Sequence, residues 1–127
     1  MTPLIRATLN RSPRVMEMLL KYGASTTVSD MNGNTPLHLA ASFGNSELVQ
    51  LLLSYNCPKN TENRFWKTPL MEACSHGNEG AVRSLLDHLT TEVMYMNGLR
   101  KTALIYAVMG VSSIIVIIST LFLLRII

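Results

Sequence analysis

The side chains with the greatest capacity for chemistry are two cysteines, Cys57 and Cys74, and three histidines, His38, His76 and His88. Thiolate and imidazole groups bind zinc, and a thiol beside an imidazole can act as a nucleophile. Zinc sites usually carry pairs spaced as Cys-x2-Cys or His-x3-His, and no such pair occurs here. No grouping of serine, histidine and acid, no paired carboxylates and no glycine-rich phosphate loop is visible. The sequence therefore predicts a protein that is not an enzyme, with no catalytic residue, no metal site and no cofactor.

Length, charge and cysteine content narrow the class of protein further. The 127 residues suit one domain, and the net charge of +3 comes from scattered side chains. Because no run of like charges forms a basic arm, we expect no nucleic-acid partner. Two cysteines are too few for a disulfide framework, and residues 1–15 lack the apolar core of a secretory signal. These features predict a cytoplasmic protein.

The elements that must position these side chains follow from a repeat of 33 residues. A threonine followed by proline or alanine and then leucine recurs at this spacing, with an alanine five residues after each threonine. Self-similarity at such a period is the signature of repeat architectures. The four triplets are Thr2-Pro3-Leu4, Thr35-Pro36-Leu37, Thr68-Pro69-Leu70 and, after a step of 34, Thr102-Ala103-Leu104.

Each repeat unit predicts two short helices. Threonine is a good N-cap and proline suits the first helical position, so in the second unit a helix is expected from Pro36 to about Phe43. Gly44-Asn45-Ser46 breaks that helix and caps a second one over roughly 46–54. Ser12-Pro13 gives the same cap-plus-proline start in the first unit. Glycine and asparagine accept the left-handed conformation of a helix stop, which predicts helix ends at Tyr22-Gly23 and Tyr55-Asn56.

The segment 32–53, Asn-Gly-Asn-Thr-Pro-Leu-His-Leu-Ala-Ala-Ser-Phe-Gly-Asn-Ser-Glu-Leu-Val-Gln-Leu-Leu-Leu, closely resembles the ankyrin repeat. The resemblance covers three units within residues 1–101, at about 2–34, 35–67 and 68–101, and a partial fourth that begins at 102. It implies an all-α solenoid of stacked antiparallel helix pairs with hairpin-like tips. It also implies a structural role for His38, whose ring fastens the first helix to its neighbours by hydrogen bonds in this family.

The later units depart from the family pattern. Trp66 and Arg100 stand where Gly33 makes the hairpin turn, the third unit has one extra residue, and Leu89 replaces its glycine stop. These departures predict strained or altered hairpin tips and less regular later units.

The resemblance implies a function as a protein–protein interaction module that acts as a scaffold or adaptor and has no small-molecule substrate. In ankyrin arrays the tips and the exposed side of each first helix line a concave, partner-binding face. Phe65-Trp66, flanked by Arg64 and Lys67, carries the residue types enriched in binding hot spots. The alternative for Trp66 is that it folds back against a neighbouring repeat. The repeat frame assigns to this face Met31, Asn32, Asn34, Ser42, Phe43, Arg64, Phe65, Trp66, Lys67, Ser75 and His76.

The C-terminal segment is strongly apolar. No charged residue lies between Lys101 and Arg125, and 13 of these 23 residues are leucine, isoleucine, valine or phenylalanine. A helix over 102–124 would span about 34 Å, enough for a bilayer core of about 30 Å. One interpretation is therefore a partial fourth repeat that merges, over 102–127, into a long apolar helix anchored in a membrane. The other is a truncated fragment of a larger ankyrin protein with no independent binding function, which the start at Thr2-Pro3 without a preceding hairpin favours.

Overall fold

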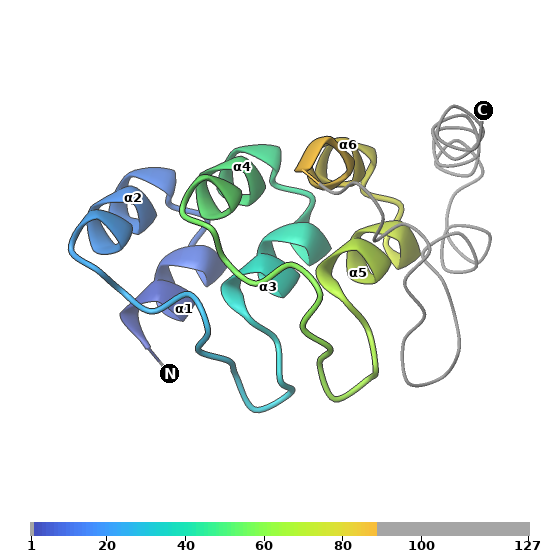
Figure 1. Cartoon of the computed structure of the whole chain (residues 1–127), viewed down its shortest axis with the longest axis horizontal. Helices are drawn as coiled ribbons and strands as arrows, with labels where there is room; N and C mark the ends of the chain where they lie inside the picture. The colour runs from blue at the N-terminus through green and yellow to red at the C-terminus, as the bar shows by residue number, and fades with distance from the viewer. Residues whose placement is uncertain (1, 89–127) are drawn as a thin grey trace.

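The computed structural model describes residues 2–88, which form six α-helices arranged as three pairs (Figure 1). Residues 2–88 contain no β-strand. Each pair joins a short first helix to a second helix through a tight turn. The helices are α1 (Pro3–Leu9), α2 (Pro13–Lys21), α3 (Pro36–Phe43), α4 (Ser46–Ser54), α5 (Pro69–Ser75) and α6 (Glu79–His88).

The three pairs stack in two layers. The first helices α1, α3 and α5 form one layer and the second helices α2, α4 and α6 form the other, as Figure 1 shows. The loops between successive pairs extend beyond the first-helix layer as hairpin-like projections. This arrangement confirms the all-α repeat fold that the resemblance implied. The apolar helix expected over 102–127 lies outside the described residues.

The first helices begin where the threonine–proline steps predicted. The hydroxyl oxygens of Thr2, Thr35 and Thr68 each accept a hydrogen bond from the backbone N–H three residues later, at 3.3, 3.4 and 3.3 Å. A proline follows each threonine in the first turn. Because these caps satisfy an otherwise unpaired N–H, helices of only seven or eight residues can form.

The second helices are capped less uniformly than the sequence suggested. Asn45 accepts a hydrogen bond from the Leu48 N–H at 3.1 Å and caps α4 as expected. Ser12 occupies the N-cap position of α2 but makes no side-chain capping bond, so the prediction of a full cap there was wrong. Only the proline at the first position of α2 performs its expected role.

One hydrophobic core runs between the two layers. The first helices contribute small buried residues such as Ala40 and Ala73, which let the second helices approach closely. The second helices contribute pairs of buried leucines, Leu52-Leu53 and Leu85-Leu86. Since each repeat covers the next, stability depends on contacts between neighbouring units.

Burial at equivalent positions depends on place in the array. Val15 in α2 is 48% exposed, whereas Leu48 and Ala81, one and two repeats later, are fully buried. The preceding helix pair covers Leu48 and Ala81, and in residues 2–88 no such pair precedes α1 and α2.

Within residues 2–88, no helix combines the length and apolar character needed to cross a membrane. The segment 102–124, for which a membrane helix was considered, is not among the described residues.

Candidate functional site

Within the part of the chain that the structure describes, two hairpin-like tips lie at the projecting end of the repeats. Tip 1 comprises residues 30–34 and tip 2 residues 63–67. In tip 1, an Asp30 carboxylate oxygen accepts hydrogen bonds from the backbone N–H groups of Asn32 and Asn34, both at 2.9 Å. The Gly33 N–H donates to the Asp30 carbonyl at 3.0 Å. These bonds fix the turn without help from a partner.

Tip 2 has the same hydrogen-bond pattern with different residues. The Asn63 side-chain oxygen accepts from the N–H groups of Phe65 and Lys67, at 2.9 and 3.1 Å. The Trp66 N–H donates to the Asn63 carbonyl at 3.0 Å, as Gly33 does to Asp30. Asn63 therefore replaces Asp30 as the residue that organises the turn.

The conformation of Trp66 is unusual for its type. Its φ is +65°, close to the +75° of Gly33, so the tryptophan adopts the left-handed conformation of the glycine that it replaces. That conformation costs a residue with a Cβ about 1–2 kcal/mol. The expectation of backbone strain at this tip is confirmed. Of the two departures considered for this tip, strain or an altered turn, the tip shows strain, and Asn63 supplies the hydrogen bonds that keep the geometry of the turn.

The two tips are bonded to each other. The Arg64 N–H donates to the Asn32 carbonyl at 2.9 Å, and the Asn63 side-chain amide donates to the Asn34 side-chain oxygen at 2.8 Å. A Cβ at Gly33 would lie 3.0 Å from the Arg64 nitrogen, so the tips touch where only glycine fits. The result is a continuous, pre-organised edge.

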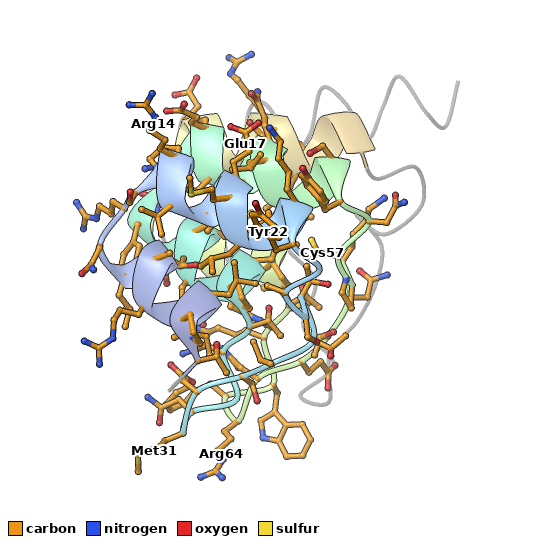
Figure 2. All side chains as sticks on the ribbon, turned by 90° about the vertical axis from the view of Figure 1, so that its left-hand side faces the viewer. Arg14, Glu17, Tyr22, Met31, Cys57 and Arg64 are labelled. Carbon is orange, nitrogen blue, oxygen red and sulfur yellow. The ribbon has the colours of Figure 1, made fainter. Side chains whose placement is uncertain are left out.

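This edge exposes large apolar side chains. Met31 is 85% exposed, Phe65 55% and Trp66 51%. Neither aromatic ring is folded into the core. Arg64, which precedes Phe65 and whose N–H bonds to tip 1, is also exposed. Figure 2 shows Met31 and Arg64 projecting at the same end of the molecule, opposite Arg14. The remaining tip residues of the predicted face are Asn32, which is exposed, and Asn34 and Lys67, which are partly buried.

A polar network lies directly beneath tip 2. The buried carboxylate of Glu72 accepts hydrogen bonds from the side chains of Asn63, at 3.1 Å, and Ser42, at 3.3 Å. Lys67 lies 3.9 Å and His76 3.5 Å from the same carboxylate. Through the Glu72 carboxylate, α3 and α5 are therefore joined to tip 2, and its Asn63 and Lys67 side chains are held in place.

Sequence reasoning missed Asn63 and Glu72. Asn63 had a usable signal, because it aligns with Asp30 in the repeat frame, where an acceptor side chain organises the turn. Glu72 aligns with Arg6 and Leu39, so the frame gave no reason to expect a buried carboxylate at this position.

The first-helix residues of the predicted face are less exposed than the tips. Ser42, Phe43 and Ser75 are partly buried and His76 is exposed. The guanidinium of Arg11 lies over the Phe43 ring, 4.8 Å from its centroid, in a cation–π contact that sequence reasoning did not foresee. This end of the face is therefore basic and aromatic as well.

His38 has the structural role that the resemblance implied. One ring nitrogen, Nδ1, accepts the Thr35 backbone N–H at 3.2 Å, so the other, Nε2, carries the proton and donates to the Lys67 carbonyl at 2.8 Å. The ring thereby ties α3 to tip 2. Burial lowers its pKa, although hydrogen bonding to Lys67 and the Glu72 charge oppose the shift.

The two cysteines are poorly suited to thiolate chemistry. Both are buried and unpaired with each other. Burial raises the pKa of Cys57 to about 11 and that of Cys74 to about 12, so both thiols are protonated near neutral pH.

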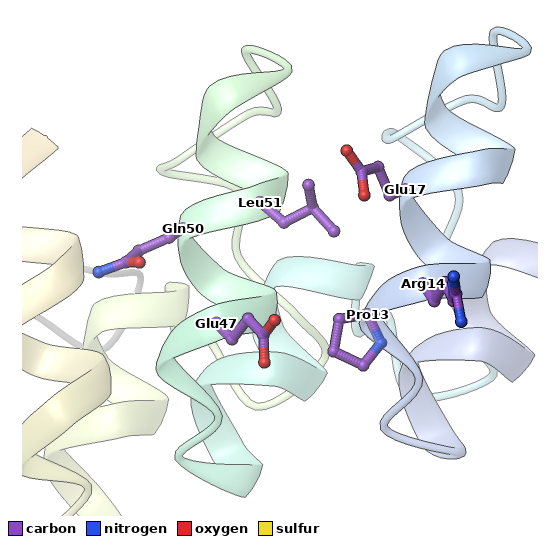
Figure 3. Close-up of a pocket in the computed structure, with 6 residues that line it drawn as sticks. All are labelled: Pro13, Arg14, Glu17, Glu47, Gln50 and Leu51. Atoms are coloured by element: carbon purple, nitrogen blue, oxygen red, sulfur yellow. The ribbon is translucent and has the colours of Figure 1, made fainter.

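A shallow groove of about 500 Å³ lies between the second helices α2 and α4 (Figure 3). Its lining residues are Pro13, Arg14, Glu17, Glu47, Gln50 and Leu51, three of which carry a charge. Ligand pockets usually enclose most of the ligand and contain few charged groups, so this open groove does not resemble one.

Comparison with known proteins agrees with the geometry. The family model described as ankyrin repeats (3 copies) matches residues 1–63 and 55–119, which together cover most of the chain. The chain belongs to the ankyrin-repeat family. Proteins of this family are generally interaction modules, with binding residues on their variable surfaces.

Curated ankyrin-repeat relatives share a limited segment. The NF-kappa-B inhibitor alpha proteins of Rattus norvegicus and Mus musculus are each 46% identical to the chain over 43 residues. That match covers 34% of this chain and 14% of each relative. The segment in common is therefore slightly longer than one ankyrin repeat.

Proposed function

We propose that this ankyrin-repeat protein is a binding module that holds another protein against tips 1 and 2 and the adjoining first helices. The observation that carries the proposal is Trp66. A half-exposed tryptophan occupies a position where the backbone favours glycine, and strained residues cluster at functional sites. The presence of this side chain in a strained conformation is readily explained if its ring contacts a partner.

The other exposed residues of the two tips support this role. Hot spots combine aromatic residues with arginine on a surface that excludes water when bound, and Phe65, Arg64 and Met31 are exposed on the same pair of bonded tips. The hydrogen bonds between the tips hold these groups in place before binding, which lowers the entropy lost on association. The mechanism is equilibrium binding.

Substitution of Trp66 by glycine tests the proposal. The change removes the ring and leaves the turn intact, since Gly33 has the same conformation in tip 1. The full chain and W66G would be used as baits, with bound proteins identified by quantitative mass spectrometry. Tyr22→Ala, which removes a 90% exposed aromatic ring from the end of α2, is the control.

We expect a partner that the full chain and the Tyr22 variant capture equally and that W66G captures at least tenfold less. If all three baits retain the same proteins, the tip surface is not the binding site. If none retains a specific protein, the alternative of a fragment without independent binding is supported instead.

Membrane attachment through residues 102–124 is a second candidate role, favoured by the run of 23 uncharged residues. The family match reaches residue 119 and favours a fourth repeat there. Extraction of cell membranes with alkaline carbonate distinguishes the two. Retention in the pellet supports a cytoplasmic repeat domain with a C-terminal anchor, and release into the supernatant rejects it.

A further inference from the structure

We propose that tip 2 selects a peptide segment that combines acidic with apolar side chains. This inference rests on the proposed function and adds the chemistry of the partner. It is drawn from the comparison of the two tips, because they share one backbone geometry and differ in side chains.

The charge differs sharply between the tips. Tip 1 contains one charged residue, Asp30, and so carries a charge of −1, whereas tip 2 contains Arg64 and Lys67 and carries +2. The difference of three charges arises at three equivalent positions of the repeat. Asn63 stands in tip 2 where Asp30 stands in tip 1, Arg64 where Met31 stands, and Lys67 where Asn34 stands. Because the backbone is held by the same bonds in both tips, the fold does not require this change.

Three acidic groups lie in or beside the tips, and each is engaged. Glu62, which directly precedes tip 2, is partly buried and interacts with the rest of the chain. The Asp30 carboxylate accepts two backbone N–H bonds within tip 1, and Glu72 is buried and contacts Lys67. Within residues 2–88, no carboxylate forms an ion pair with Arg64. The exposed charge of tip 2 is therefore positive.

Exposed acids lie instead on the second-helix layer. Glu17 pairs with Lys21 at 3.6 Å in α2, and Glu79 pairs with Arg83 at 3.0 Å in α6. Figure 2 shows Glu17 at the end of the molecule opposite Arg64. Basic side chains therefore pair with the acids of that layer, whereas Arg64 at tip 2 has no ion-pair partner among residues 2–88. An exposed, unpaired cation at the tips favours an acidic partner and orients it during approach.

The apolar part of the partner follows from Phe65 and Trp66. Each residue leaves about half of its surface in water, and burial of the apolar part of that surface supplies binding energy that an ion pair on an exposed surface does not. An acidic peptide is favoured over nucleic acid, because Arg64 and the partly engaged Lys67 are too few for the many phosphate contacts that such binding needs.

Selection from a phage-displayed library of random 12-residue peptides tests the proposal. The full chain, W66G and R64M serve as targets, and circular dichroism verifies the fold of each. Met31 is the residue at the equivalent position of tip 1, where the same backbone geometry accommodates methionine. R64M therefore removes the charge without disturbing the turn. Arg14→Met, at an exposed arginine of the second-helix layer, is the matched control.

We expect the full chain to select peptides with aspartate or glutamate beside aromatic or aliphatic residues. A fluorescein-labelled selected peptide should bind R64M about two- to tenfold more weakly than the full chain, and the Arg14 variant equally. Added sodium chloride should weaken binding to the full chain more than binding to R64M.

Four results would overturn the inference. Selection of neutral or basic peptides that still require Trp66 would reject the acidic partner and leave the proposed function in place. Equal selection by W66G, or no selection at all, would reject both. Displacement of the selected peptide by a single-stranded oligonucleotide of 12 nucleotides that binds more tightly would show that tip 2 is a nucleic-acid site.

Discussion

At residue 66 the backbone requires a conformation that glycine adopts freely and tryptophan does not. We therefore expect W66G to stabilise the protein by about 1 kcal/mol, since the φ of +65° ceases to be strained. Urea denaturation followed by circular dichroism measures the change. The variant would then be more stable and, under the proposed function, less able to bind.

The reverse comparison at Gly33 serves as the control. Gly33→Ala places a Cβ 3.0 Å from the Arg64 nitrogen at a φ of +75°, and it should lower the unfolding free energy. A lower unfolding free energy for W66G than for the full chain would show that the indole contributes packing that outweighs the strain.

His38 makes stability depend on pH. Burial lowers the pKa of His38 in the folded state, so the unfolded chain binds the proton more readily. The stabilisation is complete above the unfolded pKa of about 6.5 and decreases as the pH falls through that value. Protonation would also place a proton on Nδ1, which accepts the Thr35 N–H.

The variant His38→Met isolates this effect, because Met71 occupies the equivalent buried position one repeat later. We expect the variant to be about 1–3 kcal/mol less stable at pH 8, where it loses the bond to the Lys67 carbonyl. Its unfolding free energy should change less between pH 8 and pH 5 than that of the full chain. An identical pH profile in thermal melts would assign the dependence to other groups.

At the scale of the helices, α3 depends on a residue from the next repeat. The Asn78 side-chain amide donates to the carbonyls of Ala41, at 2.8 Å, and Ser42, at 2.6 Å, in the last turn of α3. Gly44 leaves room for this contact, since a Cβ there would lie 2.9 Å from the Asn78 side chain. Asn78 therefore caps the C-terminal end of α3, more than 30 residues earlier in the chain.

We expect Asn78→Ala to lower the unfolding free energy by about 1–3 kcal/mol, because two partly buried carbonyls each lose a hydrogen bond, although that of Ala41 keeps the one from the Gly44 N–H. Amide hydrogen exchange should rise at the C-terminal turn of α3 as well as around residue 78. Asn10→Ala, at an exposed asparagine, should change neither. Increased exchange confined to the third repeat would contradict the cross-repeat cap.

The elements themselves were largely predictable from local signals. The helices expected at 36–43 and 46–54 are α3 and α4, and the left-handed stops at Gly23 and Asn56 have φ of +84° and +56°. These features depend on nearby residues, which a sequence displays directly. The Ser12 cap failed because residue type indicates a capacity to hydrogen-bond and does not guarantee the geometry.

The candidate site was only partly predictable. The repeat frame pointed to the exposed ring of Trp66 and to Arg64, since both occupy variable tip positions. It did not reveal the buried Glu72 network, the Arg11 contact with Phe43 or the Asn78 cap. Those contacts join different repeats through side chains, and their partners are identified only when the packing between units is known.

For the whole molecule, place in the stack determines the effect of a substitution. Val15→Lys should change the unfolding free energy by no more than about 0.5 kcal/mol, because Val15 is half exposed. Leu48→Lys, at the equivalent buried position, should cost about 3–5 kcal/mol, since it buries an uncompensated charge. Equal loss of helical circular dichroism in both variants would show that the α2 face is covered in solution.

The bonds that cross from one repeat to the next also bear on how the protein is degraded. Asn78 holds the end of α3, and the Lys67 carbonyl holds the ring of His38. A protease cut between residues 67 and 78 would disrupt both of these hydrogen bonds. It would therefore destabilise α3, which lies in the preceding repeat and is not itself cut. Partial digests should therefore contain intact chain and small peptides, with few long-lived halves.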